Sequence, residues 1–276
     1  ASRSGGNSPL REIAMNTPDS TPASPELSLW HSSAQLQGAR ALQEDTIAVS
    51  ERRDGLAVVV ADGLGGHPEG EWASRTATSV VMGAPWLNAS NESLAGLMKS
   101  AIREAHAAVK RQVWRDDQPA TTLIAAFMDA ESDEITLASV GDSYALLMRD
   151  GGLRSLLMTR MPLPEGMYKY DARPRSLAYS VGYNIGVEGV GIEVQKYPLQ
   201  HGDRLLFATD GIDFIARDRI IHCLALPTPR AAAEALVREF IEAGDEQQDN
   251  VSFVVVFVQA VKGVAAATAG DPAAAP

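Results

Sequence analysis

Residues 55–67 read GLAVVVADGLGGH, an apolar run of strand length that ends in an aspartate and three glycines within four residues. Glycine lets the backbone turn sharply or approach another group closely, and Asp62 brings a negative charge to the point where the chain leaves the predicted core. The stretch lacks the G-x-G-x-x-G spacing of a dinucleotide site, because Pro68 takes the sixth position from Gly63, and it lacks the lysine of a P-loop. Two interpretations stay open here. The segment is either a strand-to-helix turn capped by the aspartate, or a ligand-binding turn in which a positively charged group offsets the charge of Asp62.

The composition of the chain narrows its class. The 276 residues, 45% of them hydrophobic, suffice for one large domain or two small ones. Lys and Arg number 24 against 35 for Asp and Glu, and the net charge of −11 argues against a general affinity for nucleic acid or anionic membranes. The single cysteine, Cys223, excludes internal disulfides and is expected to be buried and structural. The longest apolar run, 251–258, is too short to span a membrane. We therefore expect a cytoplasmic monomer without a nucleic-acid or membrane partner.

The two ends of the chain differ in composition from its middle. Residues 1–27 are rich in Ser, Pro, Thr, Asn and Gly without an apolar period, and residues 261–276 are rich in Ala, Gly and Pro. We expect both segments to be disordered, with part of the first an expression tag, and a single folded domain over 28–260.

Strand-like and helix-like runs follow one another in that domain without the strict alternation of a parallel sheet. Apolar residues near a 3.6-residue period predict helices, and short apolar runs bounded by turn residues predict strands. The turn 141–143 is expected to join its neighbours as part of a meander. Helices are expected at 68–81, 91–114 and 229–243, and strands at 46–50, 56–61, 121–128, 134–140, 144–149, 191–197, 204–209 and 251–258. Antiparallel hairpins with helical insertions predict an α+β layered fold.

Asp62 is one of five aspartates that stand at the ends of predicted strands. The others are Asp45, Asp142, Asp210 and Asp249. Each alone is typical of a turn, but five in one domain, three of them beside glycine, indicate a cluster if the strand ends converge. Like charges a few ångströms apart disfavour one another, so such a cluster needs cations. Oxygen-only ligands favour Mg²⁺ or Mn²⁺ over zinc.

Further motifs accompany these aspartates in a fixed order. They are Arg40-x-x-x-Glu44-Asp45, Asp62-Gly-Leu-Gly-Gly-His67, Thr121-Thr122, Gly141-Asp142-Ser143, Thr209-Asp210-Gly211 and Asp249-Asn250. From about Gln35 to Val258, this ordered set resembles the metal-dependent serine/threonine phosphatases of the PP2C (PPM) family in its bacterial form. The resemblance implies a four-layer α-β-β-α sandwich of two antiparallel sheets flanked by helices, with a two-metal site at one edge.

The resemblance also implies a role for each motif residue. Two core ions, Mn²⁺ or Mg²⁺, and a third weaker one would be held by Asp45, Asp62, Gly63, Asp142, Asp210 and Asp249. Asp62 would bridge the core pair, and Asp142 would belong to the third ion. Glu44, with Asp45, would hold metal-bound water, and Arg40 would bind the substrate phosphate. The implied activity is hydrolysis of phosphoserine and phosphothreonine on proteins by a metal-activated water, with a phosphoprotein substrate and a bacterial Ser/Thr kinase that it counteracts.

The sequence departs from the family pattern at several positions. Tyr144 stands where the family has an arginine after Gly-Asp-Ser, Ala120 stands where it has a glycine before Thr-Thr, and residues 157–162 replace its Asp-His pair. The family's flap corresponds to about 160–180, whose basic residues are expected to be a solvated loop rather than a phosphopeptide contact. These departures leave substrate choice and turnover open.

Two other functions compete with the phosphatase. Gly-Asp-Ser also occurs in GDSL-type esterases, but these need a late catalytic histidine, and the last one, His222, lies in an apolar helical run. His67 lies beside two glycines and a proline and is expected to be a structural residue, not an acid catalyst. A pseudo-phosphatase that binds a phosphoprotein without turning it over stays open, because a metal-stabilised domain would have the same sequence pattern.

Overall fold

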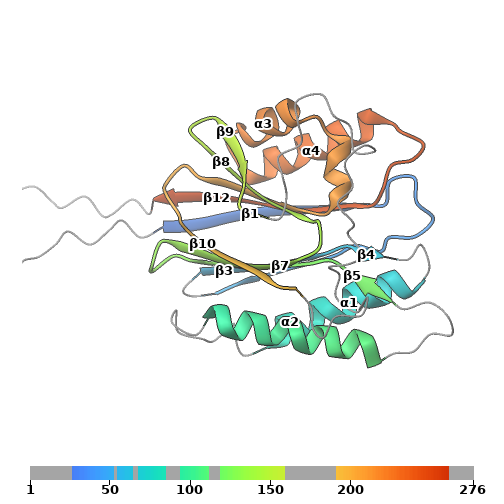
Figure 1. Cartoon of the computed structure of the whole chain (residues 1–276). Coiled ribbons are helices and arrows are strands. Elements are labelled where there is room, and N and C mark those ends of the chain that lie inside the picture. The colour runs from blue at the N-terminus through green and yellow to red at the C-terminus, as the bar shows by residue number, and fades with distance from the viewer. Residues whose placement is uncertain are drawn as a thin grey trace, which may run out of the picture.

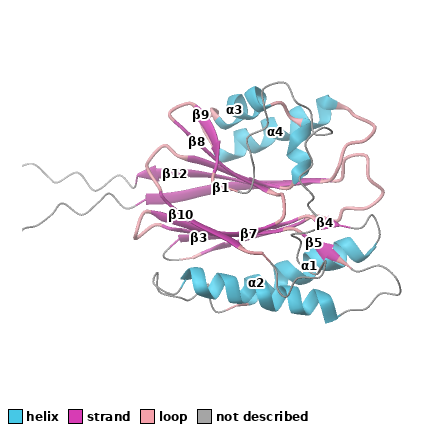
Figure 2. Ribbon diagram, viewed as in Figure 1, coloured by secondary structure: helices cyan, strands magenta, loops and turns pink. Residues whose placement is uncertain are grey.

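The structure, a computed structural model, describes residues 27–52, 55–64, 68–84, 94–111, 119–158 and 191–260. Within them, two antiparallel five-stranded sheets lie face to face between two pairs of helices (Figure 1). Figure 2 shows the same four layers by type of secondary structure. The predicted α-β-β-α sandwich is confirmed. No helix among these residues is long and apolar enough to cross a bilayer.

The upper sheet in Figure 1 carries two helices on its outer face. Its strands, in spatial order, are β1 (Leu27–Leu36), β12 (Val251–Ala260), β11 (Arg204–Ala208), β8 (Tyr144–Arg149) and β9 (Gly152–Ser155). A 3₁₀ helix, Asp210–Phe214, follows β11. The covering helices are α3 (Arg217–Leu224) and α4 (Pro229–Ala243).

The lower sheet is built in the same way. Its strands, in spatial order, are β10 (Glu193–Pro198), β7 (Glu134–Val140), β6 (Leu123–Asp129), β3 (Gly55–Ala61) and β2 (Thr46–Glu51). The helices α1 (Pro68–Gly83) and α2 (Leu94–Arg111) cover it, and a two-stranded sheet joins β4 (Gly63–Leu64) to β5 (Ala120–Thr121).

Strand β12 shows why this architecture produces continuous apolar runs. Its side chains alternate between two cores, since successive residues of a strand point to opposite faces. Val254 and Val256 lie in the core between the sheets, whereas Phe253 and Phe257 lie in the core under α3 and α4. Both faces are therefore buried, and the strand has no polar face.

Strand β1 was not anticipated from the sequence. Its middle is polar, with His31, Ser32 and Ser33 paired to valines of β12, and Trp30 is 59% exposed. It lies at the edge of its sheet, where a polar face is tolerated, so it lacks the apolar pattern of the inner strands. Leu27, assigned above to the N-terminal segment, is its first residue. The expected disordered ends and the flap otherwise lie outside the described residues.

The expectation that the turn 141–143 joins β7 and β8 as a hairpin is wrong. β7 pairs with β6 and β10, whereas β8 pairs with β11 and β9, so the chain passes here from one sheet to the other. Gly141 has φ +98°, and a Cβ at this position would lie 2.7 Å from Cγ2 of Thr122. A hairpin and a sheet-to-sheet crossing have the same local pattern of strand, short turn and strand, so the sequence did not distinguish them.

Candidate metal centre

Strand register brings the five predicted aspartates to one edge of the sandwich. The pairing of β2 with β3 places Asp45 at the same end as Asp62. The pairing of β8 with β11 does the same for Asp142 and Asp210. Strand β12 begins beside the end of β1, so Asp249 lies next to the loop between β1 and β2. The predicted convergence of strand ends follows from this antiparallel pairing.

The electrostatics of Asp62 reflect that convergence. Burial raises the pKa of Asp62 well above its ordinary value, and the charges of Asp45, Asp210, Asp142 and Asp249 raise it further. Burial also raises the pKa of Asp45 to about 7, and the charges of Asp210 and Asp249 add to the effect. The edge therefore holds a patch of carboxylates whose charges disfavour the ionised forms of Asp62 and Asp45.

Hydroxyl groups fix the backbone and carboxylate positions in this patch. Thr121 Oγ1 donates to the Asp62 carbonyl at 2.8 Å, and the Asp62 N–H donates to Thr122 Oγ1 at 3.0 Å. The Thr122 and Ser143 hydroxyls share a hydrogen bond of 2.7 Å, which ties the Asp62 segment to the crossing that carries Asp142. The Thr-Thr and Gly-Asp-Ser motifs thus act as one unit, which spacing alone does not reveal.

Asp45 is held by a hydroxyl from the other sheet. Thr209 Oγ1 donates to Asp45 Oδ2 at 2.8 Å, and Asp45 itself is only 5% exposed. A hydrogen bond to the ionised form favours that form, so Thr209 opposes the effect of burial on Asp45. Thr209 directly precedes Asp210, and its role was missed in the sequence because the contact spans 164 residues.

Glu44 and Gly63 meet at the first turns of α1. A Cβ on Gly63 would lie 2.3 Å from the Gly70 carbonyl oxygen, and a Cβ on Gly70 would lie 2.4 Å from Glu44 Oε1. Ser74 Oγ donates to the Glu44 carbonyl at 2.5 Å. Two glycines therefore let β4, α1 and the buried Glu44 approach closely. A helix N-terminus is a favourable place for a carboxylate.

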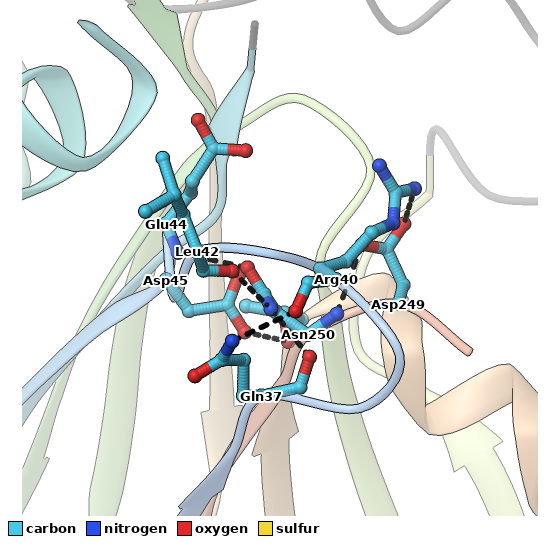
Figure 3. Close-up of polar contacts among 8 residues, drawn as sticks. Gln37, Arg40, Leu42, Glu44, Asp45, Asp249 and Asn250 are labelled. Atoms are coloured by element: carbon cyan, nitrogen blue, oxygen red, sulfur yellow. Dashed lines mark hydrogen bonds and ion pairs between the residues drawn. The ribbon is translucent and has the colours of Figure 1, made fainter. Parts of the chain in front are cut away.

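Arg40 contacts a predicted metal ligand directly. Its Nη2 donates to Asp249 Oδ2 at 2.7 Å, and the two side chains are 47% and 27% exposed (Figure 3). A guanidinium has five N–H donors, so this contact leaves donors of the half-exposed Arg40 directed toward solvent. The predicted phosphate-binding group and the predicted metal site are therefore neighbours.

The patch is not a preassembled cage. Among the residues that the structure describes, no three Asp, Glu, His or Cys side chains are grouped closely enough to hold a metal ion as they stand. His67 falls outside that part of the chain. The chemistry of the donor set is nevertheless uniform, because the five carboxylates offer only oxygen.

Most of the residues that depart from the family pattern can be placed in the structure. Tyr144 begins β8 and packs against the core under α3 and α4, and Ala120 is buried in β5 opposite Leu64. Leu157 is buried, and 159–162 lie outside the described residues. Cys223 is buried as expected, and burial raises the pKa of its thiol.

Comparisons with known proteins agree with this architecture. A family model described as protein phosphatase 2C matches residues 37–252. A serine/threonine phosphatase of Listeria welshimeri is 30% identical over 183 residues, which are 61% of this chain and 71% of the relative.

Two mycobacterial matches extend the comparison. The serine/threonine protein phosphatase PstP of Mycobacterium tuberculosis is 26% identical over 233 residues, which are 79% of this chain but 43% of that protein, so this chain spans less than half of it. The crystal structure of the PstP catalytic domain with two manganese ions has a TM-score of 0.65 at 24% identity and covers 84% of this chain and 99% of that one. The chain therefore belongs to the protein phosphatase 2C family.

Proposed function

We propose that this protein hydrolyses phosphoserine and phosphothreonine on proteins, with the help of divalent metal ions, and so reverses the action of a serine/threonine kinase. The observation that carries the proposal is the convergence of Asp62 with four other carboxylates that come from four distant segments. Membership of the family supports the reaction class. The serine/threonine phosphatases named among the relatives support a phosphoprotein substrate.

The side chains at this edge suit hard cations. Carboxylate and carbonyl oxygens are the ligands that Mg²⁺ and Mn²⁺ prefer, and a cation would offset the burial and the repulsion that together raise the pKa of Asp62. We assign two core ions to Asp62, the Gly63 carbonyl, Asp210 and Asp249, with Asp45 beside them, and a third, weaker ion to Asp142. The manganese-bound PstP structure supports the choice of metal.

Two divalent ions held there would supply a hydroxide near neutral pH and neutralise the phosphoryl oxygens. The protein's own groups would do the rest. Arg40 would grip two phosphate oxygens through its planar guanidinium. Asp45, whose Oδ2 is fixed by Thr209, would accept a hydrogen bond from water through its other oxygen. Glu44 lies at the left of Figure 3, away from the Arg40–Asp249 pair at the right, and would orient water as well.

Arg40 and a metal ion would compete for Asp249. The Arg40 guanidinium and a cation both seek the oxygen atoms of that carboxylate, and a divalent ion carries twice the charge. Metal loading would then free Arg40 for the substrate phosphate. Phosphate affinity and metal affinity are therefore expected to be linked through Asp249.

A phosphoprotein-binding module without turnover is the second candidate. It is favoured by the Arg40–Asp249 ion pair, because an aspartate already neutralised by arginine attracts a cation less strongly. The two candidates share the fold and the phosphate-binding arginine. They differ in whether bound phosphate is released as product.

One assay separates these candidates. Hydrolysis of p-nitrophenyl phosphate and of a phosphothreonine peptide, and binding of that peptide, should be measured with Mn²⁺, with Mg²⁺ and with EDTA, for the wild type and for Asp62→Asn. We expect turnover only in the wild type with metal, and Asp218→Asn, an exposed change on α3, should behave as the wild type. Phosphopeptide binding without turnover in either metal would reject the enzyme and support the binding module.

A further inference from the structure

The loop between β1 and β2, residues 37–45, carries Arg40 without any regular secondary structure of its own. Asn250 holds it with every polar group of its carboxamide. Asn250 Nδ2 donates to the Gln37 carbonyl at 2.7 Å and to the Leu42 carbonyl at 2.8 Å, and Oδ1 accepts from the Glu44 N–H at 2.8 Å (Figure 3).

These bonds close the loop into a ring. One nitrogen, Nδ2, joins the carbonyls on either side of Arg40, so the stretch 37–42 is tied at its base. Inside the ring, Gln37 Nε2 donates to the Arg40 carbonyl at 2.7 Å. The backbone that carries the guanidinium is therefore fixed by two amide side chains, and Asn250 is the one anchored in the protein, at 5% exposure.

The loop backbone also lies directly on the segment before β12. Gly38 has φ +62°, and a Cβ there would lie 2.2 Å from the Asp249 carbonyl oxygen, so a larger residue would push the loop away. The Ala39 N–H donates to the Gln248 carbonyl at 3.0 Å. The Arg40 loop and the Asp249 segment are therefore in contact along their backbones, and Asn250 is the side chain that locks them together.

We propose that Asn250 is a positioning residue that sets where Arg40 stands relative to Asp249 and hence relative to the substrate phosphate. Its backbone N–H donates to Asp249 Oδ1 at 2.9 Å, but its carboxamide acts on Arg40 only through the loop. Its significance for catalysis rests on the function proposed above. An aspartate in its place would keep the size but lose both N–H donors, and an alanine would leave two carbonyls and one N–H without their partner.

The effect of removing Asn250 is expected to be local. Asn250 belongs to none of the three apolar cores, and the partners of its carboxamide all lie in the loop. Gln248 provides a matched control, because it is also a buried amide, two residues away, but its Nε2 donates to the Phe240 carbonyl of α4 at 2.5 Å.

The test is a double-mutant cycle between Asn250→Ala and Arg40→Ala, with melting curves to confirm folding. KM and kcat for p-nitrophenyl phosphate with Mn²⁺, and the Kd of inorganic phosphate by calorimetry, are measured for each protein. We expect Asn250→Ala and Asn250→Asp to raise KM and the phosphate Kd by about tenfold, with kcat changed by less than about threefold. In the Arg40→Ala background, Asn250→Ala should raise neither further. Gln248→Ala should match the wild type.

An unchanged KM and phosphate Kd in a folded Asn250→Ala protein would overturn the proposal, as would effects that multiply in the double variant. If Asn250→Ala does not fold, Gly38→Ala tests the same contact from the loop side, with the same expected tenfold rise and the same loss of effect without Arg40. Failure of the proposed function looks different. A wild type without turnover rejects the enzyme, while the phosphate Kd still tests the role of Asn250.

Discussion

Strands β8 and β11 lie side by side, and their two ends hold aspartates in opposite surroundings. At one end, Asp203 has a fully buried side chain, and Arg149 donates to both of its oxygens, each at 2.7 Å. At the other end, Asp142 and Asp210 lie in the carboxylate patch around Asp62. At the Asp203 end, the protein itself supplies the cation, Arg149. At the Asp62 end, like charges lie together, and a bound cation would be needed to offset them.

We call the Asp203 end of these strands the structural end, and the Asp142 and Asp210 end, which is proposed to bind metal, the functional end. The hydrogen bond to Asp203 raises the pKa of Arg149, and Arg149 also donates to the Pro198 carbonyl, so the pair ties β8 of one sheet to β10 of the other. Burial raises the pKa of Asp62, and the charges of four other aspartates raise it further. Repulsion of this kind is costly to the fold and is expected where a ligand relieves it.

The largest effect is expected at the functional end. Asp62→Asn and Asp210→Asn should each reduce hydrolysis with Mn²⁺ to the uncatalysed level, because each removes a carboxylate from the metal site. The fold should persist, since neutralising one member of the patch relieves repulsion. Phosphatase assays together with melting curves check both statements, and near wild-type turnover in either variant would show that the two-metal assignment is wrong.

A substitution at the structural end should change the stability of the protein instead of its activity. Asp203→Asn breaks a buried ion pair and should lower the free energy of unfolding by about 3 kcal/mol, without changing the metal dependence of the folded enzyme. Glu234→Gln is the control, since it breaks the exposed Arg230–Glu234 pair on α4 and should leave the free energy of unfolding nearly unchanged. Urea unfolding with EDTA and with Mn²⁺ measures both. A large loss of turnover with unchanged stability in Asp203→Asn would erase the contrast between the two ends.

Arg40 tests the link between phosphate and metal at the functional end. Arg40→Ala should raise KM for a phosphopeptide by the equivalent of about 1.5–3 kcal/mol, with a smaller change in kcat, because it removes a charged contact to the substrate. Arg230→Ala, on the exposed face of α4, should leave KM unchanged. Steady-state kinetics would place Arg40 outside the site if its removal left KM at the wild-type value.

The metal-free protein should show a pH dependence of its stability. Asp45 has a pKa of about 7 in the folded protein, against an ordinary value of 3.8, so the folded state holds a proton that the unfolded chain has released. Stability from this group is therefore present below about pH 4 and is lost as the pH rises toward 7. Urea midpoints at several pH values in EDTA should fall over this range. Asp45→Asn should flatten the decline, and Mn²⁺ should offset it; an equally steep decline in Asp45→Asn would contradict the assignment.

Patterns of local origin were predictable from the sequence. Helix α4 has the predicted bounds, because Thr228 caps its start, Pro229 opens it and Gly244 ends it in the left-handed region at φ +54°. The buried strand β12 was evident from its apolar run, and the aspartates at strand ends indicated a cluster.

The remainder depends on contacts between distant segments. The edge strand β1 has no apolar alternation, and the placement of β7 and β8 in different sheets leaves no trace in the turn between them. The contacts of Arg40 with Asp249 and of Asn250 with the loop span more than 200 residues. Long-range pairing of this kind follows from the assembled sandwich and not from spacing.

The central claim is that the carboxylates around Asp62 form a two-metal site. Anomalous scattering from crystals soaked in Mn²⁺ tests it most directly. We expect two strong peaks that share Asp62, with Arg40 released from Asp249, and a third, weaker peak beside Asp142 at high Mn²⁺ concentration. The absence of any peak at Asp62, with Arg40 still bound to Asp249, would contradict the account.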